Sequence, residues 1–151
     1  MPQPWSALFA INRNPVLELN LAGITQAEAD RAPAEGLNTV TWLLRHVLDY
    51  RHETLGALDA PFTPSVPEPR SLEELISALD ETQEALSRAL EAVEDWTVLR
   101  THPALGAPTP LEQLVGIFLV HEAYHIGQIA TTRRLLGLPG ALKERKAPAH
   151  A

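Results

Sequence analysis

Proline placement limits what this chain can fold into more strongly than any other feature of the sequence. Proline costs about 3 kcal/mol or more inside a helix, but it is tolerated in a first helical turn and in connectors. Two groups of prolines stand out, one at positions 61, 64, 67 and 69 and the other at 103, 108 and 110. They predict two stiff, extended connectors that separate long helices.

The helices around these connectors have recognisable ends. Three segments of the form S/T-x-x-E, in which the first side chain and the glutamate cap each other's backbone N–H groups, begin at Thr25, Ser71 and Thr109. Gly23 and Gly137 stand where helices end. We expect long helices over 3–22, 39–58, 72–94 and 110–136, the first kinked or split by Pro15, and a short turn over 26–31. Because no period-2 alternation is sustained, the predicted fold class is all-α.

Length and charge narrow the class of protein. The 151 residues predict one domain, a bundle over 1–140 followed by a flexible tail over 141–151. The net charge is −7, and the one basic cluster is the short stretch from Lys143 to Lys146. Nucleic acids and anionic membranes both require a larger basic surface, so neither is an expected partner. The longest apolar run, from Leu114 to Val120, is too short to span a bilayer. We expect a soluble, cytoplasmic protein.

The absence of cysteine restricts the chemistry further. It excludes disulfides, iron–sulfur clusters and a thiol nucleophile on the protein. Any metal must be held by histidines and carboxylates, and any thiol must arrive with a small-molecule partner.

Three of the six histidines lie on apolar helical faces. His121 and His125 follow one another on the inward stripe of the helix over 110–136, with Cβ atoms about 5 to 6 Å apart. His46 lies on a similar stripe of the helix over 39–58, together with Tyr50 and Glu53. A buried imidazole is costly unless both ring nitrogens find partners, and a shared cation satisfies all three rings. The pattern favours a three-histidine metal site with open positions for water or substrate.

Other interpretations of these histidines remain open. A single inward histidine such as His46 is more often a hydrogen-bonded core residue than a ligand. The other three, His52, His102 and His150, are expected on a solvated helix face, in a connector and in the tail. The string His121-Glu-Ala-Tyr-His125 also matches the zinc-protease signature H-E-x-x-H. Gln128 and Thr131 occupy the positions that need Gly and His in its extended form, and no strand is available to align a peptide.

The helix over 39–58 is apolar around a wide arc. Leu44, Leu48 and Leu55 lie about 160° to 200° from His46 at 100° per residue. A dimer contact would explain this second apolar surface, and so would packing of the proline-rich connector.

Two strings in the sequence match a known family. They are Trp42-Leu-Leu-Arg-His46 and the later His121-Glu-Ala-Tyr-His125-Ile-Gly-Gln-Ile129, which is followed by Arg134. With them the sequence resembles the DinB/YfiT-like superfamily of metal-dependent enzymes, which is distinct from the DNA polymerase that shares the DinB label. It implies an up-down-down-up four-helix bundle, commonly a homodimer, that binds zinc or nickel through His46, His121 and His125. Characterised relatives include transferases and an isomerase that use bacillithiol, mycothiol or glutathione. Asn14 and Pro15 depart from the Trp-containing segment that relatives often have there.

Four further residues are candidates for the site. Gln128 lies on the inward stripe and is positioned to hydrogen-bond a metal-bound water or a ligand; alternatively it is only a polar residue at the end of the bundle. Its neighbour Gly127 permits close approach of another helix, or is only a packing contact. Glu122 flanks the metal-binding histidines and is a candidate for a general base or for a hydrogen-bond partner of one of them. The alternative is a carboxylate on the helix surface. Tyr50 and Glu53 are weaker candidates for the wall of a cofactor pocket.

We therefore expect a metal-dependent enzyme that acts on a small electrophilic substrate, with transfer to a low-molecular-weight thiol as the preferred reaction. Coordination deprotonates a thiol, and it also lowers the pKa of bound water to about 7, so hydrolysis is an alternative reaction. A non-catalytic bundle with a structural metal, and histidines buried without a metal, are the other two hypotheses.

Overall fold

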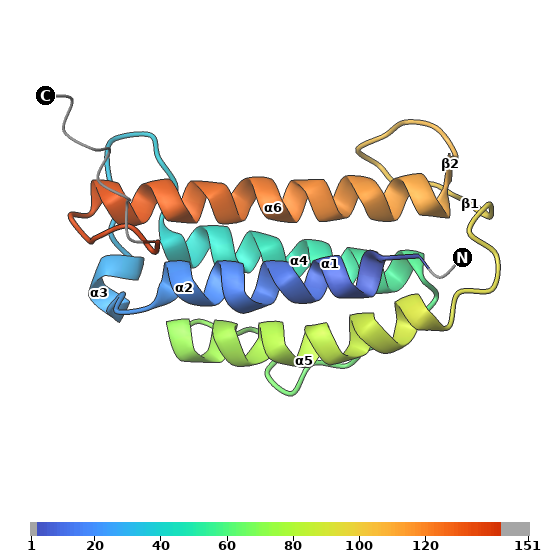
Figure 1. The fold of residues 1–151 in the computed structure, drawn as a ribbon, viewed down its shortest axis with the longest axis horizontal. Coiled ribbons are helices and arrows are strands. Elements are labelled where there is room, and N and C mark those ends of the chain that lie inside the picture. Colours follow the sequence, from blue (N-terminus) through green and yellow to red (C-terminus); the bar gives the residue numbers. More distant parts are fainter. Residues whose placement is uncertain (1–2, 143–151) are drawn as a thin grey trace, which may run out of the picture.

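Four long helical segments lie side by side in the computed structural model, which describes residues 3–142 (Figure 1). The first segment comprises α1 (Trp5–Ile11), the π-helical turn η1 (Asn12–Leu17) and α2 (Glu18–Leu21). The short helix α3 (Gln26–Ala29) precedes the other three segments, which are α4 (Val40–Ala57), α5 (Leu72–Glu91) and α6 (Leu111–Leu135). The four expected long helices and the short turn are confirmed.

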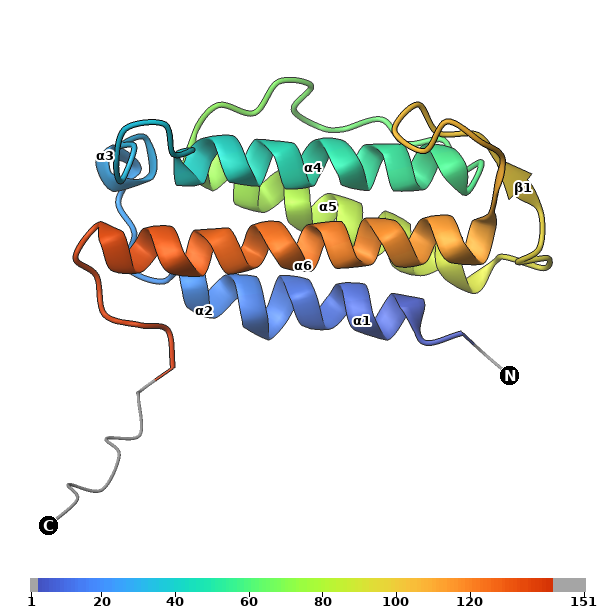
Figure 2. The same cartoon turned by 90° about the horizontal axis from the view of Figure 1, so that it is seen from above.

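The segments have the up-down-down-up order that the family resemblance implies. The first segment and α6 run in one direction, whereas α4 and α5 run in the other (Figure 1). Because α4 and α5 are parallel, residues 58–71 must return along the whole length of α4, and Figure 2 shows this connector passing over that helix. The 18 residues of α4 are about 27 Å long. A proline-rich stretch of this length spans about 40 Å, which explains why the connector contains four prolines.

The first segment bends at Pro15, as expected. Asn14 leaves the helical conformation, with φ −145° and ψ 116°, and Pro15 follows it inside the π-helical turn. Proline has no N–H to donate to the preceding turn, so the helix is interrupted by a kink there before it resumes as α2 at Glu18.

Two of the three expected capping boxes are present. At α3, the Thr25 hydroxyl accepts a hydrogen bond from the Glu28 backbone N–H, and the Glu28 carboxylate accepts one from the Thr25 backbone N–H. Ser71 and Glu74 close the start of α5 in the same way. Thr39 additionally caps α4 by accepting from the Trp42 backbone N–H.

The third expected capping box, from Thr109 to Glu112, is wrong. Thr109 belongs to the two-residue strand β2 (Thr109–Pro110), and its hydroxyl donates to the carbonyl of Ala107. This strand pairs antiparallel with β1 (Leu99–Arg100), a ladder that the sequence pattern did not predict. The first amides of α6 donate to the Val98 and Trp96 carbonyls, so backbone groups replace the expected side-chain cap.

The wide apolar arc of α4 is covered within the chain. Leu44 and Leu48 belong to the same core cluster as Leu75 and Leu79 of α5. Leu55 belongs to a second cluster, which includes Leu86 of α5 and residues from α1 and α6. The connector residues Ala60 and Phe62 also pack against this second cluster. Because α5 and the connector cover this face, the arc gives no support to a dimer contact on α4.

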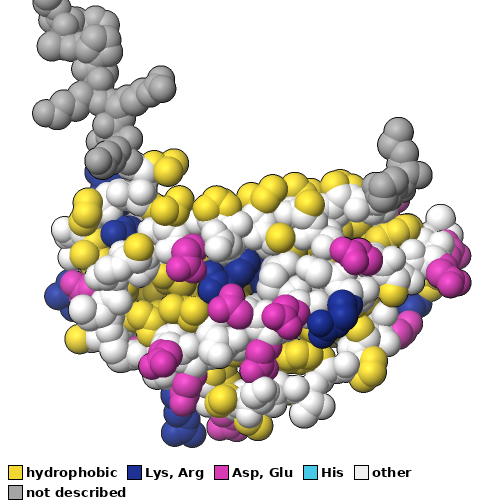
Figure 3. Space-filling model, turned by 60° about the horizontal axis from the view of Figure 1, so that its bottom comes forward, with side chains coloured by type: hydrophobic (Ala, Val, Ile, Leu, Met, Phe, Trp, Pro, Cys, Tyr) yellow, Lys and Arg dark blue, Asp and Glu magenta, His cyan; other side chains and the backbone are white. Residues whose placement is uncertain are grey.

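The outer surface carries charges of both signs. On the face shown in Figure 3, acidic and basic side chains alternate with apolar ones, and no histidine of the described residues is visible. Among residues 3–142, no helix is both long enough and apolar enough to cross a membrane. Most of the expected tail, including the basic stretch from Lys143 to Lys146 and His150, lies outside the described residues.

Candidate metal centre

Three imidazole nitrogens converge between α4 and α6. Nε2 of His46 on α4 lies 3.3 Å from Nε2 of His121 on α6, and Nε2 of His125 lies 3.0 Å from the same His121 atom. The candidate ligand atoms of the three residues all lie within 4.8 Å of one another. His121 and His125 meet because they are four residues apart on one helix face. The pairing of α4 with α6 brings His46 to them.

The spacing of these nitrogens suits a tetrahedral metal. With metal–nitrogen bonds of about 2.0–2.1 Å, two tetrahedral ligands lie about 3.3 Å apart. Imidazole suits zinc, nickel, copper and iron. Within the described part of the chain, the group contains three protein ligands, so a four-coordinate metal would keep one open position.

Gln128 orients the most buried of the three histidines. Its Oε1 lies 2.6 Å from Nδ1 of His125, so Nδ1 is the nitrogen that carries the proton and donates it. The Nε2 lone pair of His125 is then left facing the other two rings. Metal-ligating histidines almost always have such a partner on the second ring nitrogen. Nδ1 of His121 is buried and has no hydrogen-bond partner among the described residues.

The surroundings keep His46 and His121 neutral. Burial, followed by the proximity of His125 and His46, lowers the pKa of His121 to about 4. Burial, followed by the proximity of His125, also lowers the pKa of His46. A lowered pKa keeps both imidazoles unprotonated at neutral pH, which is the form that binds metal.

Two aromatic rings hold His46 and His121 in place. Tyr50, one turn after His46, has its ring centroid 3.8 Å from that of His121 and 4.9 Å from that of His46. Trp42, one turn before His46, stacks on its ring with centroids 4.9 Å apart. Tyr50 is thus in direct contact with the cluster, more closely than its sequence position indicated.

Glu53 and His102 form a contact that the sequence did not predict. The Glu53 carboxylate bonds to Nε2 of His102, while Nδ1 of His102 accepts from the backbone N–H of Ala104. His102 was expected only as a connector residue, and 49 positions separate the pair. No sequence spacing could have found it, because the fold of the second connector brings His102 to α4. Together with Tyr50, the two residues line a cavity of about 610 Å³.

Glu122 does not lie on the helix surface. Its side chain is 2% exposed, and both of its carboxylate oxygens accept hydrogen bonds from Arg51, at 2.8 and 2.9 Å. The alternative of a surface carboxylate is therefore wrong. The sequence gives no sign that Arg51 is buried, because a lone arginine within an amphipathic helix is ordinarily exposed.

Two smaller expectations also fail. His52 is half-buried against Phe62 of the proline-rich connector, with ring centroids 5.4 Å apart, and burial lowers its pKa, so it is not on a solvated face. A Cβ atom on Gly127 would meet nothing within 4 Å, so this glycine does not serve close helix approach. It lines a cavity of about 660 Å³ instead, beside Gln128 and Thr131.

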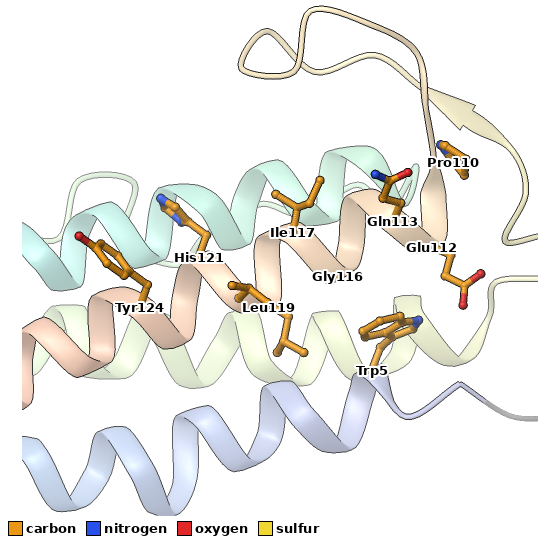
Figure 4. A pocket seen from close by; sticks show the side chains of 10 residues that line it. Trp5, Pro110, Glu112, Gln113, Gly116, Ile117, Leu119, His121 and Tyr124 are labelled. Carbon is orange, nitrogen blue, oxygen red and sulfur yellow. The ribbon is translucent and has the colours of Figure 1, made fainter.

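An open groove of about 990 Å³ runs along α6 from the histidine cluster toward α1 (Figure 4). His121 and Tyr124 line one end, and Trp5 and Pro110 line the other. Most of the side chains between them are apolar, and Gly116 leaves room for the Trp5 ring, which lies 3.4 Å from the position of an added Cβ. One of the three candidate ligands therefore borders an apolar surface.

The comparison with known proteins identifies the family of the chain. The family model of the DinB superfamily matches residues 8–129. The chain belongs to the DinB superfamily. No curated protein matches this member of the superfamily.

Solved structures show the same fold at low sequence identity. YfiT from Bacillus subtilis, described as "a probable metal-dependent hydrolase with an unusual four-helix bundle topology", is 17% identical with a TM-score of 0.70, over 89% of this chain and 87% of that one. A DinB-like protein from Bacillus cereus is 18% identical with a TM-score of 0.75, over 93% and 97% of the two chains. A conserved protein from Enterococcus faecalis is 19% identical with a TM-score of 0.73, over 90% and 98%.

Proposed function

We propose that this DinB-superfamily protein is a metal-dependent enzyme whose divalent cation, zinc or nickel, is held by His46, His121 and His125. The convergence of their three Nε2 atoms is the observation that carries the proposal. The donor set agrees with it, because His46 and His121 have lowered pKa values and Gln128 directs the His125 lone pair toward the cluster. A closed structural site would need a fourth protein ligand, and the group found in the described residues has three.

The side chains around the three ligands have distinct tasks in this proposal. A divalent cation with an open position supplies one kind of chemistry, the deprotonation of a bound thiol or water near neutral pH. Gln128 fixes the tautomer of His125, and Tyr50 keeps His121 and His46 from turning away. The cavity beside Tyr50 and Glu53 takes the small-molecule partner, since its volume lies within the usual range for such sites. Glu122 is not assigned to proton transfer, because Arg51 occupies both its oxygens.

The reaction we prefer is transfer of a small electrophilic substrate to a low-molecular-weight thiol of the bacillithiol, mycothiol or glutathione type. The absence of cysteine from the chain supports an external thiol as the nucleophile. Such thiols are kept reduced in the cytoplasm, where we propose that the protein acts. Metal-dependent hydrolysis is the second candidate, favoured by the similarity to YfiT and its description.

Metal analysis of the purified protein tests the centre directly. Wild-type protein supplemented with zinc or nickel should retain about one equivalent after gel filtration, while His46→Ala and His121→Ala should retain little. His52→Ala is the matched control, since His52 lies on α4 away from the cluster. Equal and negligible metal in all four proteins would refute the three-histidine centre.

Substrate panels then separate the two reactions. Loaded wild-type protein should consume bacillithiol, mycothiol or glutathione in the presence of an electrophile, whereas His121→Ala should not. Turnover of esters or amides without any thiol would favour the hydrolase. A protein that binds metal and does neither would favour the non-catalytic bundle.

We also propose that two copies of the chain associate through the exposed apolar side chains of α1 and α6. Ile11 is 50% exposed, Val120 69% and Tyr124 63%, and the two helices pack side by side. Val120→Glu should shift the wild-type dimer toward monomer in sedimentation, whereas Leu99→Glu, at an exposed apolar position on β1, should not. A monomeric wild-type protein would contradict this arrangement.

A further inference from the structure

A buried ion pair joins the two helices that supply the histidines. Arg51 of α4 is 1% exposed and Glu122 of α6 is 2% exposed. Nε and Nη2 of the arginine donate to the two carboxylate oxygens at 2.8 and 2.9 Å, which makes two parallel charge-assisted bonds. This geometry fixes both the distance and the orientation between the side chains.

The same guanidinium also reaches the other two helical segments. Its Nη1 donates to the Leu79 carbonyl and to the Thr82 hydroxyl of α5, at 3.3 and 3.5 Å. Its Nη2 approaches the Phe9 carbonyl of α1, at 3.5 Å. This one side chain of α4 therefore bonds to the other three long segments of the bundle. Leucine packing alone is less directional and restricts the sliding of one helix along another less strictly.

The Arg51–Glu122 pair lies close in the sequence to two of the three histidines. Glu122 adjoins His121 in the sequence, and Arg51 follows His46 by five residues on α4. A displacement of α4 along α6 would separate His46 from His121 and would break the paired bonds at the same time. Burying two charges seldom adds stability over well-packed apolar side chains, and the best-attested use of such groups is to specify register.

From this geometry we infer that Arg51 and Glu122 are positioning residues, which hold α4 and α6 in the register that brings His46 onto His121 and His125. The inference rests on the proposed metal centre and names two residues that bind no metal themselves. Glu122 then acts through the placement of the imidazoles rather than as a base.

The test separates metal affinity from folding. Arg51→Met combined with Glu122→Leu replaces the pair by apolar side chains of similar length. This removes the hydrogen bonds that fix the register of α4 on α6, and it leaves no charge unpaired. The apo form of this double variant should keep a cooperative thermal transition. Its zinc affinity, measured by competition with a chromogenic chelator, should fall about 10- to 100-fold, as for other residues that orient metal ligands.

A second ion pair, in which the arginine is buried and the carboxylate is exposed, supplies the control. Arg13 of η1 bonds to Asp80 of α5 at 2.7 Å, and neither helix carries a candidate ligand. Arg13→Met combined with Asp80→Leu should leave zinc affinity within about twofold of wild type, even if it lowers the melting temperature. Equal losses in both double variants would indicate a general effect of packing and would overturn the inference.

Arg51→Lys covers the case in which the first double variant fails to fold. Lysine retains the buried charge, but its single ammonium cannot make two parallel bonds to Glu122 while also reaching the Phe9 and Leu79 carbonyls. We expect a loss of zinc affinity of several-fold, with altered visible absorption of the cobalt-substituted protein. Wild-type affinity and an unchanged cobalt spectrum in Arg51→Lys would overturn the inference.

The wild-type measurement distinguishes the two proposals. A wild-type protein that does not bind zinc, nickel or cobalt would refute the proposed function. Tight wild-type binding that both the Met/Leu double variant and Arg51→Lys retain would refute the positioning role alone.

Discussion

Nδ1 of His125 lies 2.6 Å from Oε1 of Gln128, one turn further along α6. This bond leaves Nε2 of His125 directed at His121, from which it is separated by 3.0 Å. Gln128 was a candidate for binding a metal-bound water or a ligand. In the structure the Gln128 oxygen instead accepts a hydrogen bond from His125, one of the three candidate metal-binding residues. We therefore expect Gln128 to set the orientation of the His125 ring.

Removing this partner should weaken metal binding more than it weakens the fold. We predict that Gln128→Ala lowers zinc affinity about 10-fold or more, because His125 becomes free to rotate and to change its tautomer. Gln113→Ala is the matched control, since Gln113 is exposed on the same helix. Chelator competition measures both variants. Equal zinc affinities for wild type and Gln128→Ala would contradict the prediction.

The apo protein should lose stability on acidification. The folded-state pKa values of His46 and His121 lie below the ordinary value of 6.5, so the unfolded chain binds more protons in this range. Stability is fully present above about pH 6.5 and falls as the pH is lowered toward 4, the folded-state value of His121. Thermal melts of metal-free protein between pH 7.5 and 4.5 measure this loss.

Substitutions identify which histidines cause the loss of stability at low pH. The buried His52 has a lowered pKa and acts with the same sign, so its contribution must be removed separately. In a His52→Gln background, His121→Ala should flatten the pH dependence of the melting temperature. An undiminished dependence would show that other groups are responsible.

The contact between Glu53 and His102 should hold the second connector against α4. His102→Ala removes this contact, and we expect faster amide hydrogen exchange over residues 100–108 with unchanged metal content. The cost in the free energy of unfolding should be below about 1 kcal/mol, because Glu53 is partly exposed to solvent. Thr97→Ala, in the same connector but away from α4, is the control. Unchanged exchange in His102→Ala would contradict the role of the contact.

The second apolar face of α4 should stabilise the single chain. Leu48 is 3% exposed, and we predict that Leu48→Ala lowers the free energy of unfolding by about 2–5 kcal/mol, since it leaves a cavity against α5. Leu99→Ala, which removes a side chain 59% exposed, should change it by no more than about 0.5 kcal/mol. Urea denaturation gives both values. A cost for Leu48→Ala that depends on protein concentration would instead indicate a contact between chains.

Local rules accounted for most of the fold. Thr25 and Ser71 cap their helices as their spacing to a glutamate predicts, because a capping box involves only four consecutive residues. Thr109 has the same spacing and fails, because a strand pairing with residues 99–100 draws it out of the helix. Here a contact between segments that are distant in the sequence prevented the capping box that the local pattern predicts.

The candidate site divides in the same way. Helical periodicity put His121 and His125 on one face and His46 on the apolar stripe of another helix, so the three rings were predictable. Arg51, which bonds to Glu122 71 positions away, carried no such signal. Neither did His102, whose partner Glu53 lies on a helix that precedes it by 49 positions.

The sequence by itself determined the helices, the connectors and the faces on which His46, His121 and His125 lie, because proline, capping residues and a 3.6-residue period act over a few neighbouring positions. Only the tertiary structure decided that α5 covers the far side of α4, that Glu122 is buried, and that Arg51 bonds to the other three segments. These outcomes depend on which helices become neighbours, and the packing of the whole chain settles that choice.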